Sequence, residues 1–149
     1  MSEHNASIRW SRGNHPFTYD GYSRDHQWSF DGGQTLVASA AQAYRGSAEG
    51  VDPEEALVAA LSSCHMLTLL AIAAKKGWVV ESYEDDAVGT LAKGANGRLA
   101  VTRVVLRPRI VFSGDKLPDD DALQRLHHQS HEHCFIANSV RTEISIEPR

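Results

Sequence analysis

The sequence predicts an α+β domain in which strands and two helices follow one another in the order ββ-α-ββ-α-β. Three observations carry this prediction: an apolar segment over 53–76 with clear helix start and stop signals, turn-linked runs of β-forming residues before and after it, and a strict polar–apolar alternation near the C-terminus. A chain of 149 residues is long enough to bury the core of one domain. We therefore expect a single domain over 1–149, with a loose N-terminal segment over 1–18.

Short strands with turns are expected before the first helix. Residues 19–30 carry several aromatic side chains and end in the turn sequence Asp31-Gly32-Gly33, after which residues 35–39 read Thr-Leu-Val-Ala-Ser. Glycine after Asp favours the tight turns that join antiparallel strands. This stretch therefore predicts a hairpin.

The first predicted helix has clear start and stop signals in the sequence. Asp52 is a good N-cap, Pro53 fits the first helical position, and Glu54 and Glu55 favour the positive end of the helix dipole. The helix is expected to end at Lys75 and Lys76, with Gly77 as the stop. One face has helical spacing and its neighbours Leu67 and Leu70 are also apolar, so we expect this helix to be buried nearly all round; the face comprises Leu57, Leu61, Cys64, Thr68 and Ala71.

A second hairpin, a second helix and a final strand complete the prediction. Residues 79–91 and 98–112 are rich in Val, Leu and Ile and are joined by Lys93-Gly94-Ala95-Asn96-Gly97. The run 119–121 is Asp-Asp-Asp and can cap a helix, and residues 140–147 alternate as a half-exposed strand does. The inner face of the second helix is expected to contain Leu123, Leu126, His127, Ser130 and Cys134.

Composition and charge exclude several classes of function. The net charge is −4 and the 15 basic residues form no run, so we expect no nucleic-acid partner. Residues 1–5 show no export signal, and the apolar stretch around Cys64 is broken by Ser62, Ser63 and His65, so we expect no membrane-spanning segment. The expected compartment is the reducing cytoplasm, where two cysteines are reactive or ligating rather than joined in a permanent disulfide.

The two cysteines, Cys64 and Cys134, are the best indication of function. A thiolate can attack a peroxide to become a sulfenic acid, and a second thiol can condense with that acid to a disulfide. The attacking thiolate needs a stabilising cation. Cys64 lies roughly 15 Å beyond the N-terminus of its predicted helix, too far for the helix dipole to act, so an arginine or a protonated histidine must supply the charge.

Other interpretations of the same residues remain open at this point. Cysteine is often a simple core filler. A zinc site could draw on the Cys/His set Cys64, His65, His131, His133 and Cys134, although the spacing fits no standard motif. A cysteine hydrolase would need an orienting residue such as Asn138. We expect His127, His128 and His131 individually to be solvated or hydrogen-bonded surface groups, and the role of the cluster 127–133 is left open.

Three motifs together resemble the OsmC/Ohr family, named for osmotic induction and organic hydroperoxide resistance. They are Asp-Pro-Glu-Glu at 52–55, Ala-Ala-Leu-Ser-Ser-Cys-His at 59–65, and His-Glu-His-Cys-Phe-Ile-Ala-Asn-Ser-Val at 131–140. The resemblance implies antiparallel sheets around two core helices and an obligate, intertwined homodimer with active sites at the subunit interface. It also implies a thiol peroxidase for organic hydroperoxides that needs no cofactor and is regenerated by an external dithiol, of the lipoyl type or another.

The resemblance also assigns residues. Cys64 matches the peroxidatic cysteine, Cys134 the resolving cysteine, and Glu54 the glutamate of the Pro-Glu step. The family stabilises its thiolate with an arginine from the N-terminal strands, for which Arg45 is our first choice and Arg24 the rival. The main alternative is a non-enzymatic dimer that binds zinc or another ligand through the Cys/His cluster.

Two departures place the chain nearer an OsmC-like branch than the main Ohr sequences. His65 follows the first cysteine, and Phe135 follows the second, where Ohr members commonly have proline. These departures bear on substrate preference more than on the redox chemistry.

Overall fold

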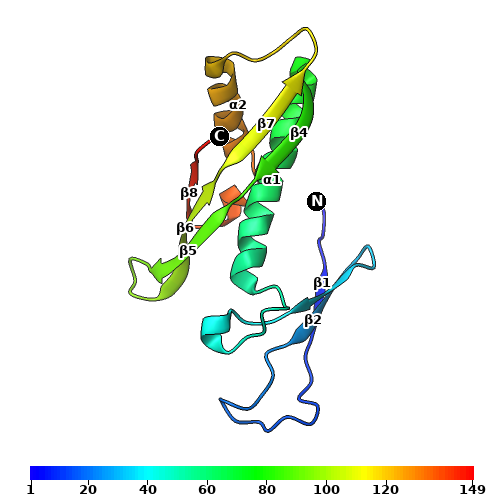
Figure 1. Cartoon of the computed structure of the whole chain (residues 1–149), viewed down its shortest axis with the longest axis vertical. Coiled ribbons are helices and arrows are strands. Elements are labelled where there is room, and N and C mark those ends of the chain that lie inside the picture. The colour runs from blue at the N-terminus through cyan, green and yellow to red at the C-terminus, as the bar shows by residue number, and fades with distance from the viewer. The chain divides into compact units, whose positions relative to one another are not determined.

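The computed structural model describes residues 1–149 and divides into two compact units, Met1–Ala56 and Leu57–Arg149. Besides two short 3-10 turns, the chain forms three strands, the long helix α1 (Pro53–Lys76), four strands, helix α2 (Asp120–Glu132) and a last strand (Figure 1). Helix α1 begins in the first unit and continues through the second. The predicted α+β class is confirmed, whereas the single domain over 1–149 stays a prediction.

The N-terminal unit contains a three-stranded antiparallel sheet. Its strands β1 (Ala6–Arg9), β2 (His26–Phe30) and β3 (Thr35–Ala38) are neighbours in that order. The predicted hairpin is the β2–β3 pair, and Gly33 takes a positive φ of 81° in its turn. The segment 1–18, expected to be loose, contains β1, because pairing with β2 orders four exposed residues whose own pattern predicts no strand.

Helix α1 begins and ends where the sequence predicts. The backbone N–H of Glu55 donates to Asp52 Oδ1 at 2.7 Å, and the backbone N–H of Asp52 donates to Glu55 Oε2 at 3.1 Å, which is a reciprocal capping box. At the other end Gly77 adopts a φ of 73°, the left-handed conformation that stops a helix.

The burial of α1 differs from the expectation. Its fully buried residues lie on one face, at Leu61, His65, Leu69 and Ala73. A second face is exposed and made of small or apolar side chains: Ala60, Ser63, Leu67, Ala71 and Ala74. The expectation of burial nearly all round was therefore wrong for the single chain, because its sheets and α2 cover only one side of an apolar helix.

In the C-terminal unit each of the two long predicted strands is divided in two. Strand β4 (Val79–Asp85) pairs with β7 (Pro108–Ser113), and β5 (Val88–Lys93) pairs with β6 (Leu99–Leu106), all antiparallel. The predicted hairpin around 93–97 is the β5–β6 connection. The break falls at Arg107, because its N–H donates to Asp85 Oδ1 at 2.6 Å rather than to a strand carbonyl.

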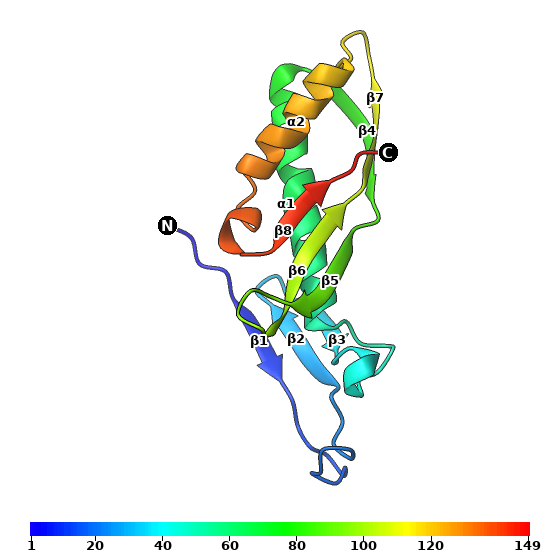
Figure 2. The same cartoon turned by 90° about the vertical axis from the view of Figure 1, so that its left-hand side faces the viewer.

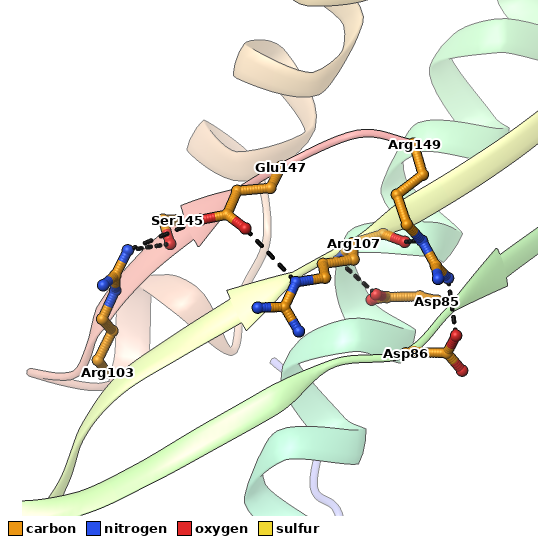
Figure 3. Close-up of polar contacts among 7 residues, drawn as sticks. All are labelled: Asp85, Asp86, Arg103, Arg107, Ser145, Glu147 and Arg149. Carbon is orange, nitrogen blue, oxygen red and sulfur yellow. Dashed lines mark hydrogen bonds and ion pairs between the residues drawn. The ribbon is translucent and has the colours of Figure 1, made fainter.

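The last strand, β8 (Glu143–Ile146), joins β6 in parallel and is tied down by polar contacts at its end. Glu147 pairs with Arg107 at 3.4 Å and with Arg103 at 3.8 Å, and Arg149 pairs with Asp86 at 2.8 Å (Figure 3). These ion pairs are exposed, so each adds about 0–1 kcal/mol to stability. Their main effect is to set the position of the C-terminal segment against β6.

Helix α2 and α1 pack together over the strands of the C-terminal unit (Figure 2). The side chain of Asp119 caps α2 by accepting the N–H of Ala122 at 2.7 Å, as the Asp run predicts. One core cluster joins α1, α2, β4 and β7 around Leu69, Ala73 and Leu126. A second core cluster joins α1 to β6 and β8 around Leu61, Val104 and Leu106.

By length and composition alone α1 is long and apolar enough to cross a membrane. The core helix of a soluble protein passes the same test, and here α1 packs against α2 and the sheets. A single such helix is weak evidence for a membrane span.

Candidate functional site

The structure brings the two cysteines together in the C-terminal unit. Cys64 lies half-buried in α1, and Cys134 lies just beyond the end of α2 with 2% of its surface exposed. Both are free thiols, and Cys64 lies near enough to Cys134 to raise the pKa of its thiol. Two neighbouring thiols can form a disulfide with little rearrangement of the backbone.

Cys134 is held firmly by the turn that follows α2. Its backbone N–H donates to the carbonyl of His131 at 3.2 Å, and its own carbonyl accepts the N–H of Asn138 at 3.0 Å. The N–H of Ala137 donates to Cys134 Sγ at 3.4 Å. The position of this sulfur therefore depends directly on the position of α2.

Burial is the main electrostatic influence on Cys134. It raises the pKa of the Cys134 thiol to about 11, and the neighbouring Cys64 side chain adds to the rise, while the Ala137 N–H opposes it. At neutral pH this side chain is a protonated thiol. Such a group is a poor first nucleophile and can serve as the second thiol of a pair.

Cys64 borders a cavity of about 920 Å³ that runs along the exposed face of α1. The lining is mostly apolar, and two of its members are strongly exposed: Leu67 at 59% and Phe135 at 82%. Gln129 and His133 line the far side of the cavity, and Lys75 lines it near the C-terminal end of α1. The cavity gives an apolar molecule access to Cys64 rather than to Cys134.

The N-terminal unit contains the other predicted site residues. Arg24 and Glu54 line one cavity of about 430 Å³, together with His26 and Tyr44. The Arg24 guanidinium donates to the carbonyls of Tyr19 at 2.5 Å and Tyr22 at 2.6 Å, and it forms no ion pair with a carboxylate. Its positive charge is thus held in place and left without a counter-ion.

Arg45 is placed differently. It is paired with Asp20 at 2.6 Å, lies 4.7 Å from the centre of the Tyr19 ring, and does not line the cavity that contains Glu54. Its backbone has a φ of 65° at the end of a 3-10 turn (Gln42–Tyr44). The structure thus brings Cys64 together with Cys134 and Arg24 together with Glu54, each pair within its own unit.

A pair of buried histidines was missed by the sequence analysis. His65 Nε2 and His127 Nδ1 are 3.1 Å apart, the ring planes differ by 4°, and the exposed fractions are 1% and 5%. His127 was expected to be a surface group, yet it lies on the predicted inner face of α2 between Leu123, Leu126 and Ser130. Its spacing was the signal, because a histidine at a core position needs a partner inside the core.

The remaining histidines give no metal site. His128 lies on the outside of α2 and approaches Glu132 at 3.3 Å. No group of three or more His, Cys, Asp or Glu side chains is placed to hold a metal ion. The amide N–H of Asn138 donates to the carbonyl of Glu132 at 2.9 Å, and Asn138 has no hydrogen bond to a histidine of the kind that a hydrolase would need.

Comparisons with known proteins agree on one family. Residues 46–149 match the family model described as OsmC-like protein. A solved OsmC-like protein of unknown function from Vibrio cholerae is 52% identical, with all of both chains covered and a TM-score of 0.95. The protein YmaD of Bacillus subtilis is 25% identical over 103 residues, 68% of each chain.

A more distant solved structure shares the fold alone. The organic hydroperoxide resistance protein OhrB of Bacillus subtilis is 16% identical, with 99% of this chain and 98% of that chain covered and a TM-score of 0.66. The predicted arrangement of two helices with antiparallel sheets is confirmed by these likenesses.

Proposed function

Because the chain belongs to the OsmC-like protein family, we propose that it is a thiol-dependent peroxidase that reduces organic hydroperoxides to alcohols. The observation that carries this proposal is the proximity of Cys64, which borders an apolar cavity, to the buried Cys134. Solved proteins of the same fold are named organic hydroperoxide resistance proteins, which supports the substrate class.

The reaction assigns unequal roles to the two cysteines. The Cys64 thiolate attacks the outer oxygen of ROOH, an S–O bond forms, the O–O bond breaks, and RO⁻ takes up a proton to leave as the alcohol. Cys134 then attacks the Cys64 sulfenic acid, giving a disulfide and water. An external dithiol reduces the disulfide by thiol exchange and is itself oxidised, so no resident cofactor is needed.

Arg24 and Glu54 are proposed to stabilise the Cys64 thiolate as a pair. They line the same cavity in the N-terminal unit, and Arg24 forms no ion pair with a carboxylate, whereas Arg45 is paired with Asp20. A guanidinium near a thiol favours the charged form and lowers its pKa.

The enzyme is further proposed to act as a cytoplasmic homodimer. The exposed face of α1 carries Leu67 and borders the cavity at Cys64, and a second copy of the chain would remove this apolar surface from water. A site at the subunit interface would also allow the N-terminal unit of one copy to serve the cysteines of the other.

The test is intact-mass measurement after adding one equivalent of cumene hydroperoxide to the fully reduced protein. The wild-type mass should fall by two hydrogens as the disulfide forms. Cys134→Ser should stop at the sulfenic acid, which a dimedone-type reagent traps, and Cys64→Ser should not react. Full peroxidase activity in Cys64→Ser would contradict the proposal.

A ligand-binding function without catalysis is the second candidate, favoured by the size and apolar lining of the cavity along α1. It predicts that apolar ligands bind and that hydroperoxides bind without being consumed. Elemental analysis adds a check on the zinc version of this function, since stoichiometric zinc that blocks thiol labelling would support it.

A further inference from the structure

The buried pair His65–His127 is the one hydrogen bond between the side chains of α1 and α2. The 3.1 Å separation of Nε2 and Nδ1 requires one ring to donate and the other to accept. The outer nitrogens, His65 Nδ1 and His127 Nε2, have no partner although both are buried. Unpaired buried nitrogens cost stability, so a purely structural contact between these helices would be better made by apolar side chains.

The two histidines are placed where they can control the thiols. His65 directly follows Cys64 in α1, and His127 lies about two helical turns before Cys134. The turn after α2 binds Cys134 through its N–H, its carbonyl and its sulfur. Any change in the separation of α1 and α2 at the level of the imidazoles is therefore passed on to the two sulfur atoms.

We propose that His65 and His127 are positioning residues for disulfide formation: their hydrogen bond holds α1 and α2 at the separation at which Cys64 and Cys134 meet. The proposal deepens the peroxidase assignment and rests on it only for the physiological oxidant. The step that they position is attack of the Cys134 thiol on the Cys64 sulfenic acid, which forms the S–S bond and releases water.

The charge state of the pair is consistent with this role. Burial lowers the pKa of His65 to about 4, with further lowering by His127 and His131, and burial also lowers the pKa of His127. Both rings are neutral at pH 7. A hydrogen bond between two neutral rings is thus available at that pH.

The test measures the thiol–disulfide equilibrium directly and needs no peroxide. Reduced protein is equilibrated with reduced and oxidised glutathione at pH 7, so that oxidised glutathione accepts the two electrons and two protons of the thiols. His127→Leu fills the space but removes the hydrogen bond, and its equilibrium constant for the Cys64–Cys134 disulfide should fall at least about tenfold.

Two conservative variants and one surface variant serve as matched controls. His127→Asn places an amide near the former Nδ1, and His65→Gln places one near the former Nε2, so both should stay within about threefold of wild type. His128→Ala removes a histidine of the same helix that is 72% exposed and should change nothing.

The double variant His65→Leu/His127→Leu leaves no unpaired buried nitrogen. It therefore still tests the loss of the hydrogen bond if the single variant His127→Leu does not fold. Its equilibrium constant should be as low as that of His127→Leu. A wild-type constant in either Leu variant, or an equally low constant in His127→Asn, would overturn the positioning role. A wild-type protein that forms the disulfide with glutathione but consumes no hydroperoxide would instead refute the peroxidase function and leave the positioning role standing.

Discussion

Exposure separates the roles of the two cysteines. Cys64 borders an apolar cavity, while Cys134 is 2% exposed and its thiol pKa is raised to about 11, mainly by burial. In the proposed reaction the substrate therefore reaches Cys64 first, and Cys134 reacts only once Cys64 has been oxidised. From the sequence alone a two-thiol redox pair was the preferred interpretation, with metal binding and core filling as open alternatives.

The choice of arginine can be tested by matched neutral variants. Arg24→Met should lower kcat/KM for cumene hydroperoxide by about a hundredfold, because it removes the charge that we propose stabilises the reacting thiolate. Arg45→Met breaks only the exposed pair with Asp20 and should stay within a few-fold of wild type.

A thermal melt of both arginine variants shows whether either change is structural. The rate of Cys64 alkylation at pH 7 distinguishes two causes of lost activity in Arg24→Met. Slower alkylation than in wild type indicates loss of the thiolate, whereas an unchanged rate indicates loss of substrate binding. Greater loss of activity in Arg45→Met than in Arg24→Met would return the role to Arg45.

Two contacts set how the elements of the C-terminal unit pack on α1. The imidazoles of His65 and His127 join α1 to α2 on one side. On another side of α1, Gly89 of β5 lies very close to Val58. A Cβ added at Gly89 would be 2.5 Å from Val58 Cγ2. Both contacts leave little freedom for α1 to move against its neighbours.

The histidine pair makes stability depend on pH in a predictable direction. The pKa of His65 is about 4 in the folded chain and about 6.5 in the unfolded chain, so its stabilising effect is complete above pH 6.5 and is lost as pH falls toward 4. For His65 alone the loss is on the order of 3 kcal/mol in the free energy of unfolding.

Urea unfolding at several pH values between 4 and 7 measures this dependence. The variant His65→Leu/His127→Leu should flatten the curve over that range, while His128→Ala should keep the wild-type slope. An unchanged slope in the double variant would show that other groups carry the pH dependence.

Gly89→Ala should destabilise the protein by about 1–3 kcal/mol, because the added methyl group pushes β5 away from α1. Gly94→Ala is the control, since a Cβ there meets its nearest atoms at an ordinary 3.7 Å. Chemical denaturation of both variants gives the difference. Equal stability would mean that β5 shifts without cost.

At the scale of the whole molecule, the main feature is an apolar helix with one uncovered face. The buried face of α1 completes both core clusters, while the opposite face leaves Leu67 59% exposed beside the cavity at Cys64. Exposed apolar surface of this kind next to reactive groups marks an interaction site. A second copy of the chain is the occupant that we propose.

Leu67→Asp should therefore convert a dimer to a monomer, because a carboxylate at the centre of an apolar interface is costly to bury. Leu117→Asp is a closely matched control, since Leu117 is also 59% exposed but lies in the loop before α2. Light scattering coupled to size exclusion gives the mass of each. A wild-type protein with the mass of one chain, or a Leu67→Asp variant that stays dimeric, would contradict this arrangement.

Local patterns were enough to predict most elements and their ends. Asp52, Gly77 and Asp119 cap or stop the helices as expected, and the 31–33 turn joins β2 to β3. The β4–β5 and β6–β7 breaks were missed, because they depend on Asp85 accepting a hydrogen bond from Arg107, a residue distant in the sequence. Caps act within one turn of the chain, whereas breaks of this kind depend on partners that only folding brings near.

The sequence by itself determined the fold class, the two candidate cysteines and the two arginine candidates, because each follows from local spacing or from motifs. Tertiary structure alone decided that Cys64 and Cys134 are neighbours, that Arg24 rather than Arg45 shares a cavity with Glu54, and that His127 pairs with His65 inside the core. The physical reason is burial. Periodicity predicts which face of a helix turns inward. The residues that a side chain contacts on that face lie far along the chain, and they determine its pKa and its chemistry.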